Sequence, residues 1–247
     1  MMQKNLIAIP IYNEEKNLFK VIDALFSQIN IKCTEILAID DGSSDNSLGI
    51  LSNFPEIKLI RNVKNHGYGF SILRAFQYAQ KRGFKYLLTM DADGQHLPFC
   101  IKDFFDIAGS ADIISGSRYL IESKEPEAII RERYNINMKI TRILMEITEF
   151  NLTDSFCGMK LYTVDTLQNF NISDYNYAMP LQVIIQAWHK GLTWKEIPVP
   201  LLYLDTHRNF NNLYENSSAR YDYYIETIKR ELEKIDYEPN SDIWSAS

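Results

Sequence analysis

Two aspartates one residue apart, Asp91 and Asp93, are the sharpest chemical feature of the sequence. They follow the apolar run at residues 86–90, so both carboxylates are expected at the end of one strand, where their repulsion is costly without a cation. A hard divalent ion, Mg2+ or Mn2+, held jointly by these carboxylates and by the phosphates of a substrate removes that cost. Gln95 can add an amide oxygen to the ligands. The alternative is that residues 91–94 form only an Asx-type turn.

Apolar runs and helix-period segments alternate around this pair. Strands are predicted at residues 6–10, 35–40, 58–62, 86–90 and 112–115, and helices at residues 15–28, 45–53, 70–81 and 98–108. Strand followed by helix, repeated, predicts an α/β fold with a Rossmann-like, mainly parallel sheet flanked by helices. After residue 120 we expect a helical C-terminal elaboration. Its predicted elements are helices at residues 131–150, 179–190 and 219–235 and strands at residues 194–197 and 201–204.

A polar cluster follows each of the first five predicted strands, at residues 10–15, 40–45, 65–69, 91–96 and 116–119. Because ligands bind outside the carboxyl ends of the strands in an open parallel sheet, these clusters predict a single binding edge. The first cluster contains no glycine, which argues against an NAD or FAD fingerprint, and no P-loop sequence occurs. Two clusters have a simpler alternative: Gly67 and Gly69 fit a tight turn, and Ser44 or Asp45 fits a helix N-cap.

The composition narrows the class of protein. The 247 residues include 26 Lys and Arg against 32 Asp and Glu, a net charge of −6 that carries no electrostatic footprint for nucleic acid. Three cysteines without a Cys-x-x-Cys pair fit reduced, buried thiols better than a disulfide framework or a zinc site. No apolar run reaches about 18 residues, and the first run is too short for a signal peptide. We therefore expect a cytoplasmic protein that does not span a membrane.

Five segments occur in a fixed order: Pro10/Tyr12-Asn13-Glu14, Asp40-Asp41-Gly42-Ser43-Ser44-Asp45, Asn65/Gly67/Gly69, Asp91-Ala92-Asp93-Gly94-Gln95-His96 and Gly116-Ser117-Arg118-Tyr119. In that order they resemble the family 2 inverting glycosyltransferases of GT-A fold, and within them the dolichyl- and polyprenyl-phosphate mannosyl- and glucosyltransferases. The resemblance implies transfer of a hexose from a nucleotide sugar of the GDP-mannose or UDP-glucose type to a polyprenyl or dolichyl phosphate, with Mg2+ or Mn2+ as the cofactor.

The resemblance also implies a role for each matching residue. The nucleotide side would include Pro10, Tyr12, Glu14, Asp40, Asp41, Gly67, Gly69 and Asp91, with Asp40 on the base or ribose. Asp91, Asp93 and Gln95 would hold the metal on the diphosphate. Arg118 would face the acceptor phosphate or the leaving group. Asp154 begins a segment similar to the family's Asp-x-x-x-Gly-Phe-Lys/Arg pattern and would lie near the sugar.

The sequence predicts a single domain. No internal repeat and no low-complexity linker divides the chain. We predict one domain over residues 1–236, with a nucleotide-sugar-binding half at 1–120 and an acceptor half at 121–236. Residues 237–247 are expected to form a flexible tail.

The acceptor side departs from the family pattern. Gln182 stands where the pattern has an acidic residue, Pro180 interrupts the usual position of a glutamine, and residues 203–210 lack the glycine and lysine expected there. A phosphate acceptor is already an anion. A hydroxyl acceptor, on a lipid-linked or surface glycan, would instead need a general base, and Asp154 is the candidate.

Basic residues concentrate between Arg118 and Arg142, where apolar side chains at 136, 140, 143, 144 and 147 can line one helix face. This pattern predicts peripheral contact with an anionic membrane. The alternative is an ordinary amphipathic helix packed on the sheet, with its charged face in water.

Two other functions fit parts of the pattern. A nucleotidyltransferase of related fold is disfavoured, because no Gly-rich basic loop follows the first strand. A catalytically inactive nucleotide-sugar-binding protein is the alternative from another class, although the acids Asp91, Asp93 and Asp154 argue against lost catalysis.

Overall fold

The computed structural model describes residues 5–120, 128–201 and 217–244. They form a seven-stranded sheet in the order β3-β2-β1-β4-β6-β5-β7. Its strands are β1 (Asn5–Ile11), β2 (Thr34–Asp40), β3 (Lys58–Arg61), β4 (Tyr86–Thr89), β5 (Ile113–Ser117), β6 (Lys160–Thr163) and β7 (Trp194–Pro198). Strands β1 to β5 lie where the sequence predicts the first five strands, within two residues at each end. Of the strand predicted at 201–204, residues 202–204 lie outside the described residues.

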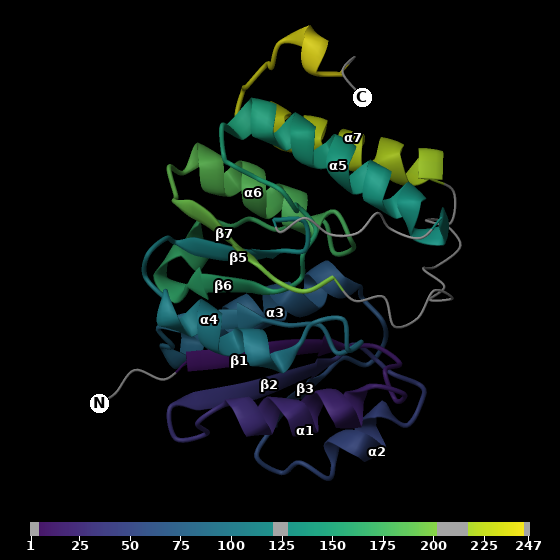
Figure 1. The fold of residues 1–247 in the computed structure, drawn as a ribbon, viewed down its shortest axis with the longest axis vertical. Coiled ribbons are helices and arrows are strands. Elements are labelled where there is room, and N and C mark those ends of the chain that lie inside the picture. The colour runs from purple at the N-terminus through teal and green to yellow at the C-terminus, as the bar shows by residue number, and fades with distance from the viewer. Residues whose placement is uncertain (1–4, 121–127, 202–216, 245–247) are drawn as a thin grey trace.

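Helices cover both faces of the sheet (Figure 1). They are α1 (Leu18–Gln28), α2 (Ser47–Leu51), α3 (Tyr68–Arg82), α4 (Ile101–Asp106), α5 (Ala128–Thr148), α6 (Met179–His189) and α7 (Ser217–Glu233), with 3-10 turns η1 (Pro98–Cys100), η2 (Val164–Asn169) and η4 (Ser241–Trp244). One core joins β1 to α1, α2 and α4, and a second joins β1 to α3 and α6.

The sequence of β1 explains why both faces are covered. Successive side chains of a strand point to opposite faces, and Ile7, Ile9 and Ile11 enter the first core whereas Leu6 and Ala8 enter the second. A strand buried on both sides must be apolar throughout, as this one is. Helices α5 and α7 form a further layer on α6, built on a third apolar cluster.

Strand β6 is the one strand of this sheet that runs against its neighbours. It pairs antiparallel with β4 and with β5, whereas the other pairings are parallel. The amino-terminal end of β6 therefore lies at the edge where the parallel strands have their carboxyl ends. This reversal brings residues 154–160 to the predicted binding edge.

Residues 237–244, the described part of the predicted tail, contact the helical layer at Tyr237 and Ile243. Ile243 is buried in the cluster shared with α5, α6 and α7, and Tyr237 packs edge-on against Trp188 at 4.9 Å between ring centroids. Aromatic and apolar side chains make these contacts, while Glu238, Asn240, Ser241 and Asp242 between them are exposed.

Candidate active site

The loops that follow β1 and β2 are bonded to each other. Asn13 adopts a left-handed φ of 57°, which asparagine tolerates better than most residues. Its Oδ1 accepts a hydrogen bond from the backbone N of Ser44 at 2.8 Å, and its backbone N donates to Ser43 Oγ at 3.0 Å. The backbone N of Glu15 donates to Asp45 Oδ2 at 2.9 Å. Both loops thus form one pre-organised wall at the sheet edge.

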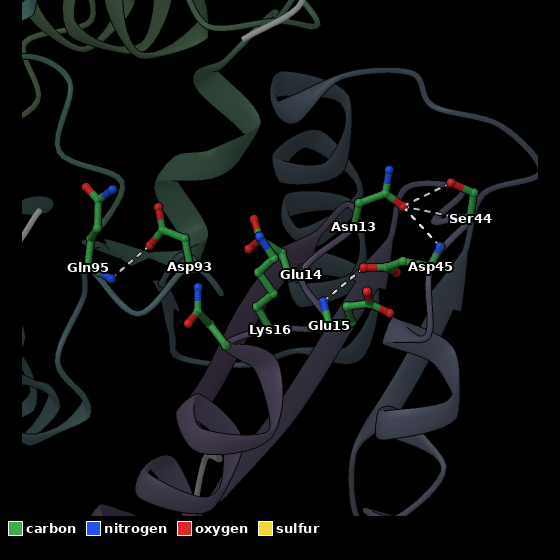
Figure 2. A pocket seen from close by; sticks show the side chains of 9 residues that line it. Asn13, Glu14, Glu15, Lys16, Ser44, Asp45, Asp93 and Gln95 are labelled. Atoms are coloured by element: carbon green, nitrogen blue, oxygen red, sulfur yellow. Dashed lines mark hydrogen bonds between the residues drawn. The ribbon is translucent and has the colours of Figure 1, made fainter. Parts of the chain in front are cut away.

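A pocket of about 340 Å3 opens beside this wall. Figure 2 shows Asp93 and Gln95 on one side of it and Asn13, Glu14, Ser44 and Asp45 on the other; Glu15, Lys16 and Asn17 complete the lining. The structure therefore brings together three of the predicted site residues, Glu14, Asp93 and Gln95. Pro10, in β1, and Tyr12, directly after it, precede Glu14 in the chain and are not among the residues that line the pocket.

The two acids at the end of β2 differ in their surroundings. Both oxygens of Asp41 are bonded, to Asn62 Nδ2 at 2.6 Å and to the backbone N atoms of His66 and Gly67 at 2.7–3.0 Å. Asp41 therefore shapes the loop before α3. Asp40 accepts from the backbone N of Ser43 through Oδ1, whereas its buried Oδ2 has no hydrogen-bond partner and lies 3.4 Å from Arg61 Nε.

The glycines of the third cluster are explained by packing. Gly67 has a φ of 105°, and a Cβ there would lie 2.2 Å from the carbonyl oxygen of Tyr175. A Cβ at Gly69 would lie 2.5 Å from the carbonyl oxygen of Asp174. Any larger residue would push the start of α3 away from the segment before α6, so packing requires glycine both at Gly67, directly before α3, and at Gly69, inside it.

Asp91 and Asp93 lie in a loop that His96 holds. The imidazole Nδ1 accepts a hydrogen bond from the backbone N of Asp91 at 2.9 Å, and burial lowers the pKa of His96 to about 4. The backbone N of Gln95 donates to Asp93 Oδ1 at 2.9 Å. A neutral His96 is required here, because only an unprotonated Nδ1 can accept that bond.

Both carboxylates are destabilised as anions, Asp91 by burial and Asp93 by burial and by the charge of Asp91. Burial raises the pKa of Asp91 to about 6, against the opposing charges of Arg118 and Lys160. Burial and then the charge of Asp91 raise the pKa of Asp93. Asp91 Oδ1 is buried without a hydrogen-bond partner. Burial and the charge of Asp91 also raise the pKa of Tyr68.

The fit of this pair to a divalent cation can be judged from its packing. Gly158 lies so close to Asp91 that a Cβ there would be 2.5 Å from Asp91 Oδ2. The absence of a side chain at Gly158 therefore leaves space for the Asp91 carboxylate. Within the described ranges no group of three or more His, Cys, Asp or Glu side chains is gathered as a complete metal cage. Two neighbouring carboxylates, one of which has an oxygen without a hydrogen bond at Asp91 Oδ1, suit Mg2+ or Mn2+, which takes its other ligands from substrate phosphates and water.

Arg118 and Asp154 form a buried ion pair. Arg118 Nε donates to Asp154 Oδ2 at 2.6 Å and Nη2 donates to Oδ1 at 2.9 Å, the two-pronged geometry that guanidinium groups favour. Burial alone would raise the pKa of Asp154, but the charge and hydrogen bonds of Arg118 outweigh it and hold this pKa below its usual value. Arg118 also interacts electrostatically with Asp91 and Asp93, so the ion pair and the acidic pair belong to one site.

Residues 6–170 match glycosyl transferase family 2, which is more than half of the sequence. The chain belongs to this family. Similar proteins include polyprenol monophosphomannose synthase of Mycolicibacterium smegmatis, 24% identical over 80% of this chain and 77% of the relative. Undecaprenyl-phosphate mannosyltransferase of Micrococcus luteus is 23% identical over 78% of this chain and 82% of the relative.

The fold of this family 2 glycosyltransferase is GT-A. Glucosyl-3-phosphoglycerate synthase of Mycobacterium tuberculosis, crystallised with Mn2+, UDP and glucosyl-3-phosphoglycerate, superposes with a TM-score of 0.71 over 97% of this chain and 82% of that one. Its sequence identity is 13%. The family and the fold agree with the expectations drawn from the five motifs.

The structure adds residues that sequence reasoning did not single out. Lys160 is buried, its burial lowers its pKa, and its Nζ donates to the carbonyl oxygen of Cys157. Its charge lowers the pKa values of Asp91 and Asp154. Asn137 of α5 donates from Nδ2 to Asp154 Oδ1 at 2.9 Å. Asn137 and Thr141 are polar residues four positions apart within the otherwise apolar face of α5. This break in the apolar pattern is the sequence signal that could have identified Asn137. Glu196 of β7 reaches the same segment.

The apolar face of α5, predicted to contact a membrane, is covered by other helices of the protein. Ile136, Ile140, Ile143, Leu144 and Ile147 are all buried against α6 and α7, so the apolar face of this helix packs within the protein. Arg118 lies inside the site, while Lys139 and Arg142 are exposed. No helix in the described part of the chain combines the length and apolar character needed to cross a bilayer. Lys124 lies outside the described residues.

Proposed function

We propose that this glycosyltransferase transfers a hexose, with inversion and with a divalent metal, from a nucleotide sugar of the GDP-mannose or UDP-glucose type to a polyprenyl or dolichyl phosphate. The observation that carries the proposal is that Asp93, which lines the pocket at the sheet edge, interacts electrostatically with Asp91 and with Arg118. A pair of carboxylates with a neighbouring fixed guanidinium matches what a diphosphate leaving group requires.

The leaving diphosphate gains negative charge as the glycosidic bond breaks. Asp91 and Asp93, with Gln95, would hold Mg2+ or Mn2+ on the diphosphate, and the metal when bound would supply electrostatic stabilisation of that charge. The solved neighbour that contains Mn2+ and UDP supports a divalent ion in this fold. Arg118 adds a second positive charge that cannot be lost at physiological pH.

The nucleotide would lie against the wall formed by the loops after β1 and β2. Glu14 lines the pocket opposite Asp93, and Pro10 and Tyr12 precede Glu14 in the chain. Asp40 keeps one buried oxygen without a hydrogen-bond partner, which suits an N–H donor of the base or a hydroxyl of the ribose.

A phosphate acceptor is supported by the names of two relatives, a polyprenol monophosphomannose synthase and an undecaprenyl-phosphate mannosyltransferase. Such an acceptor lies in a membrane, so the enzyme would work at the cytoplasmic membrane face. The exposed cations Lys139 and Arg142 of α5 would favour an anionic surface.

The test combines a donor screen with an acceptor. Purified protein is incubated with GDP-mannose, UDP-glucose and related donors, short polyprenyl phosphate, and Mg2+ or Mn2+, and glycolipid is quantified. We expect transfer that chelator abolishes and that Asp93→Ala lowers by about 100-fold or more, since the lost ligand leaves diphosphate charge uncompensated. Asp103→Ala, an exposed carboxylate on α4, serves as the control and keeps full activity. Full transfer in excess chelator would refute metal dependence, and transfer only to soluble glycans would refute the phosphate acceptor.

A further inference from the structure

The two oxygens of Asp154 accept five hydrogen bonds. Oδ2 accepts from Arg118 Nε at 2.6 Å and from the Arg118 backbone N at 3.2 Å. Oδ1 accepts from Arg118 Nη2 at 2.9 Å, from Asn137 Nδ2 at 2.9 Å and from the Phe156 backbone N at 3.2 Å. The side chain is 0% exposed. A general base needs a lone pair within reach of the acceptor's proton, and this carboxylate has its lone pairs occupied by protein donors.

We infer that Asp154 acts on the reaction through Arg118, and that Asn137 and Glu196 are positioning residues that hold Asp154 in place. The inference rests on the proposed function, because it assigns Arg118 to the phosphates. Asp154 fixes Nε and Nη2 of the guanidinium, and the ring of Tyr119 lies 5.5 Å from its central carbon. The guanidinium is therefore oriented before any ligand arrives, and its side chain is 19% exposed.

Asn137 connects this ion pair to helix α5. A carboxylate can only accept hydrogen bonds, so the amide nitrogen of Asn137 must face Asp154. The amide oxygen accepts from Thr141 Oγ1 at 3.0 Å, one turn further along the helix. Thr141 Oγ1 in turn accepts from the backbone N of Ser155 at 3.2 Å. Helix α5 thereby fixes both the carboxylate and the backbone that carries it.

Glu196 holds the same backbone from the other side. Its Oε2 accepts from the backbone N of Thr153 at 2.8 Å and from the Thr153 hydroxyl, and its Oε1 accepts from the backbone N of Asp154 at 3.3 Å. Thr153 Oγ1 also lies 2.5 Å from Ser117 Oγ, next to Arg118 in the chain. Strand β7 and helix α5, both from the second half of the chain, thus determine where Arg118 of the first half stands.

Double-mutant cycles distinguish positioning from base catalysis. If Asp154 acts through Arg118, the two changes remove the same stabilisation, so their effects overlap; if Asp154 takes a proton from the acceptor, their effects multiply. We expect Asp154→Asn alone to lower kcat by about 10-fold to 100-fold, in the range of a hydrogen bond to a charged group. In the Arg118→Ala background the same change should lower kcat by no more than about twofold.

Asn137→Ala provides the second cycle, because removing the buried charge of Asp154 can prevent folding. We expect it to lower kcat by about 5-fold with little change in KM, and to have no further effect in the Arg118→Ala background. Asn135→Ala, an exposed asparagine two residues earlier on the same helix, is the matched control and should leave kcat unchanged. Millimolar guanidinium should partly restore Arg118→Ala while Asp154 is present, and should fail to restore Arg118→Ala/Asp154→Asn.

The outcomes separate this inference from the proposed function. The cycles are run with whichever acceptor the wild-type enzyme uses, so absent transfer to polyprenyl phosphate counts against the proposed function alone. Overlapping effects with that acceptor support positioning. If Asp154→Asn, or Asn137→Ala where Asp154→Asn does not fold, lowers kcat by the same factor with and without Arg118, the inference is overturned.

Discussion

Replacing Gly158 by Ala would place a methyl group against the carboxylate of Asp91. The new Cβ would lie 2.5 Å from Oδ2 and 2.7 Å from Oδ1, whereas ordinary contact begins at 3.4 Å. The carboxylate must therefore retreat by about 0.9 Å, the difference between 3.4 and 2.5 Å. Because a displacement of about 1 Å in a positioned group can cost about 100-fold in rate, we expect kcat/KM to fall by about that factor.

The stability of this variant should change much less than its activity. The atoms that the methyl group meets belong to the end of a side chain, which can rotate, so we expect the free energy of unfolding to fall by about 1 kcal/mol, at the low end for added methyl groups in packed sites. The assay measures transfer across a range of Mn2+ concentrations, with Mn2+ binding followed separately by calorimetry in the presence of the nucleoside diphosphate. We expect weaker Mn2+ binding as well as slower transfer.

Gly49→Ala is the matched control. A Cβ there would also meet a side-chain oxygen, Asn46 Oδ1 at 2.2 Å, but Asn46 is exposed and can swing into solvent. This variant should keep full activity and Mn2+ affinity. If Gly158→Ala transfers sugar within about threefold of the wild-type rate and binds Mn2+ equally well, then the position of Asp91 does not limit the reaction, and the role given to this carboxylate is wrong.

Three further predictions concern other parts of the molecule. Arg118→Lys should lower turnover by about 10-fold or more in the transfer assay, because a lysine cannot make both hydrogen bonds to Asp154. An unchanged rate would contradict the role given to the guanidinium group. Sedimentation with anionic vesicles should show binding that weakens as the salt concentration rises. The double variant Lys139→Glu/Arg142→Glu should weaken this binding by about 10-fold, whereas the control Lys81→Glu on α3 should leave it unchanged. Binding that is independent of salt would refute an electrostatic contact. The folded-state pKa of Asp154 is lowered, so its stabilisation is present above the unfolded pKa near 3.8 and is lost as pH falls through the folded value. The difference in free energy of unfolding between wild type and Asp154→Asn should therefore shrink below about pH 4, and a difference that grows on acidification would reverse this assignment.

The sequence alone determined the edge of the sheet and the acids on it. Continuous apolar runs such as that of β1 are strands buried on both faces, and the polar clusters after them mark the carboxyl ends. These signals are local, because strand, turn and helix preferences act over a few residues. The pair Asp91 and Asp93 could be located in the same way, since two acids one residue apart share one strand end whatever the rest of the fold does.

Only the tertiary structure decided what surrounds those acids. Asp154 meets Arg118 across 36 residues of sequence because β6 is inserted antiparallel between β4 and β5, and no short-range pattern specifies that pairing. Whether the apolar stripe of α5 faces a membrane or the protein depended on α6 and α7, which supply an apolar surface of their own. Asp40 and Asp41 are adjacent in sequence, yet Asp40 keeps one oxygen without a hydrogen bond whereas both oxygens of Asp41 are hydrogen-bonded, because successive residues at a strand end point to different neighbours.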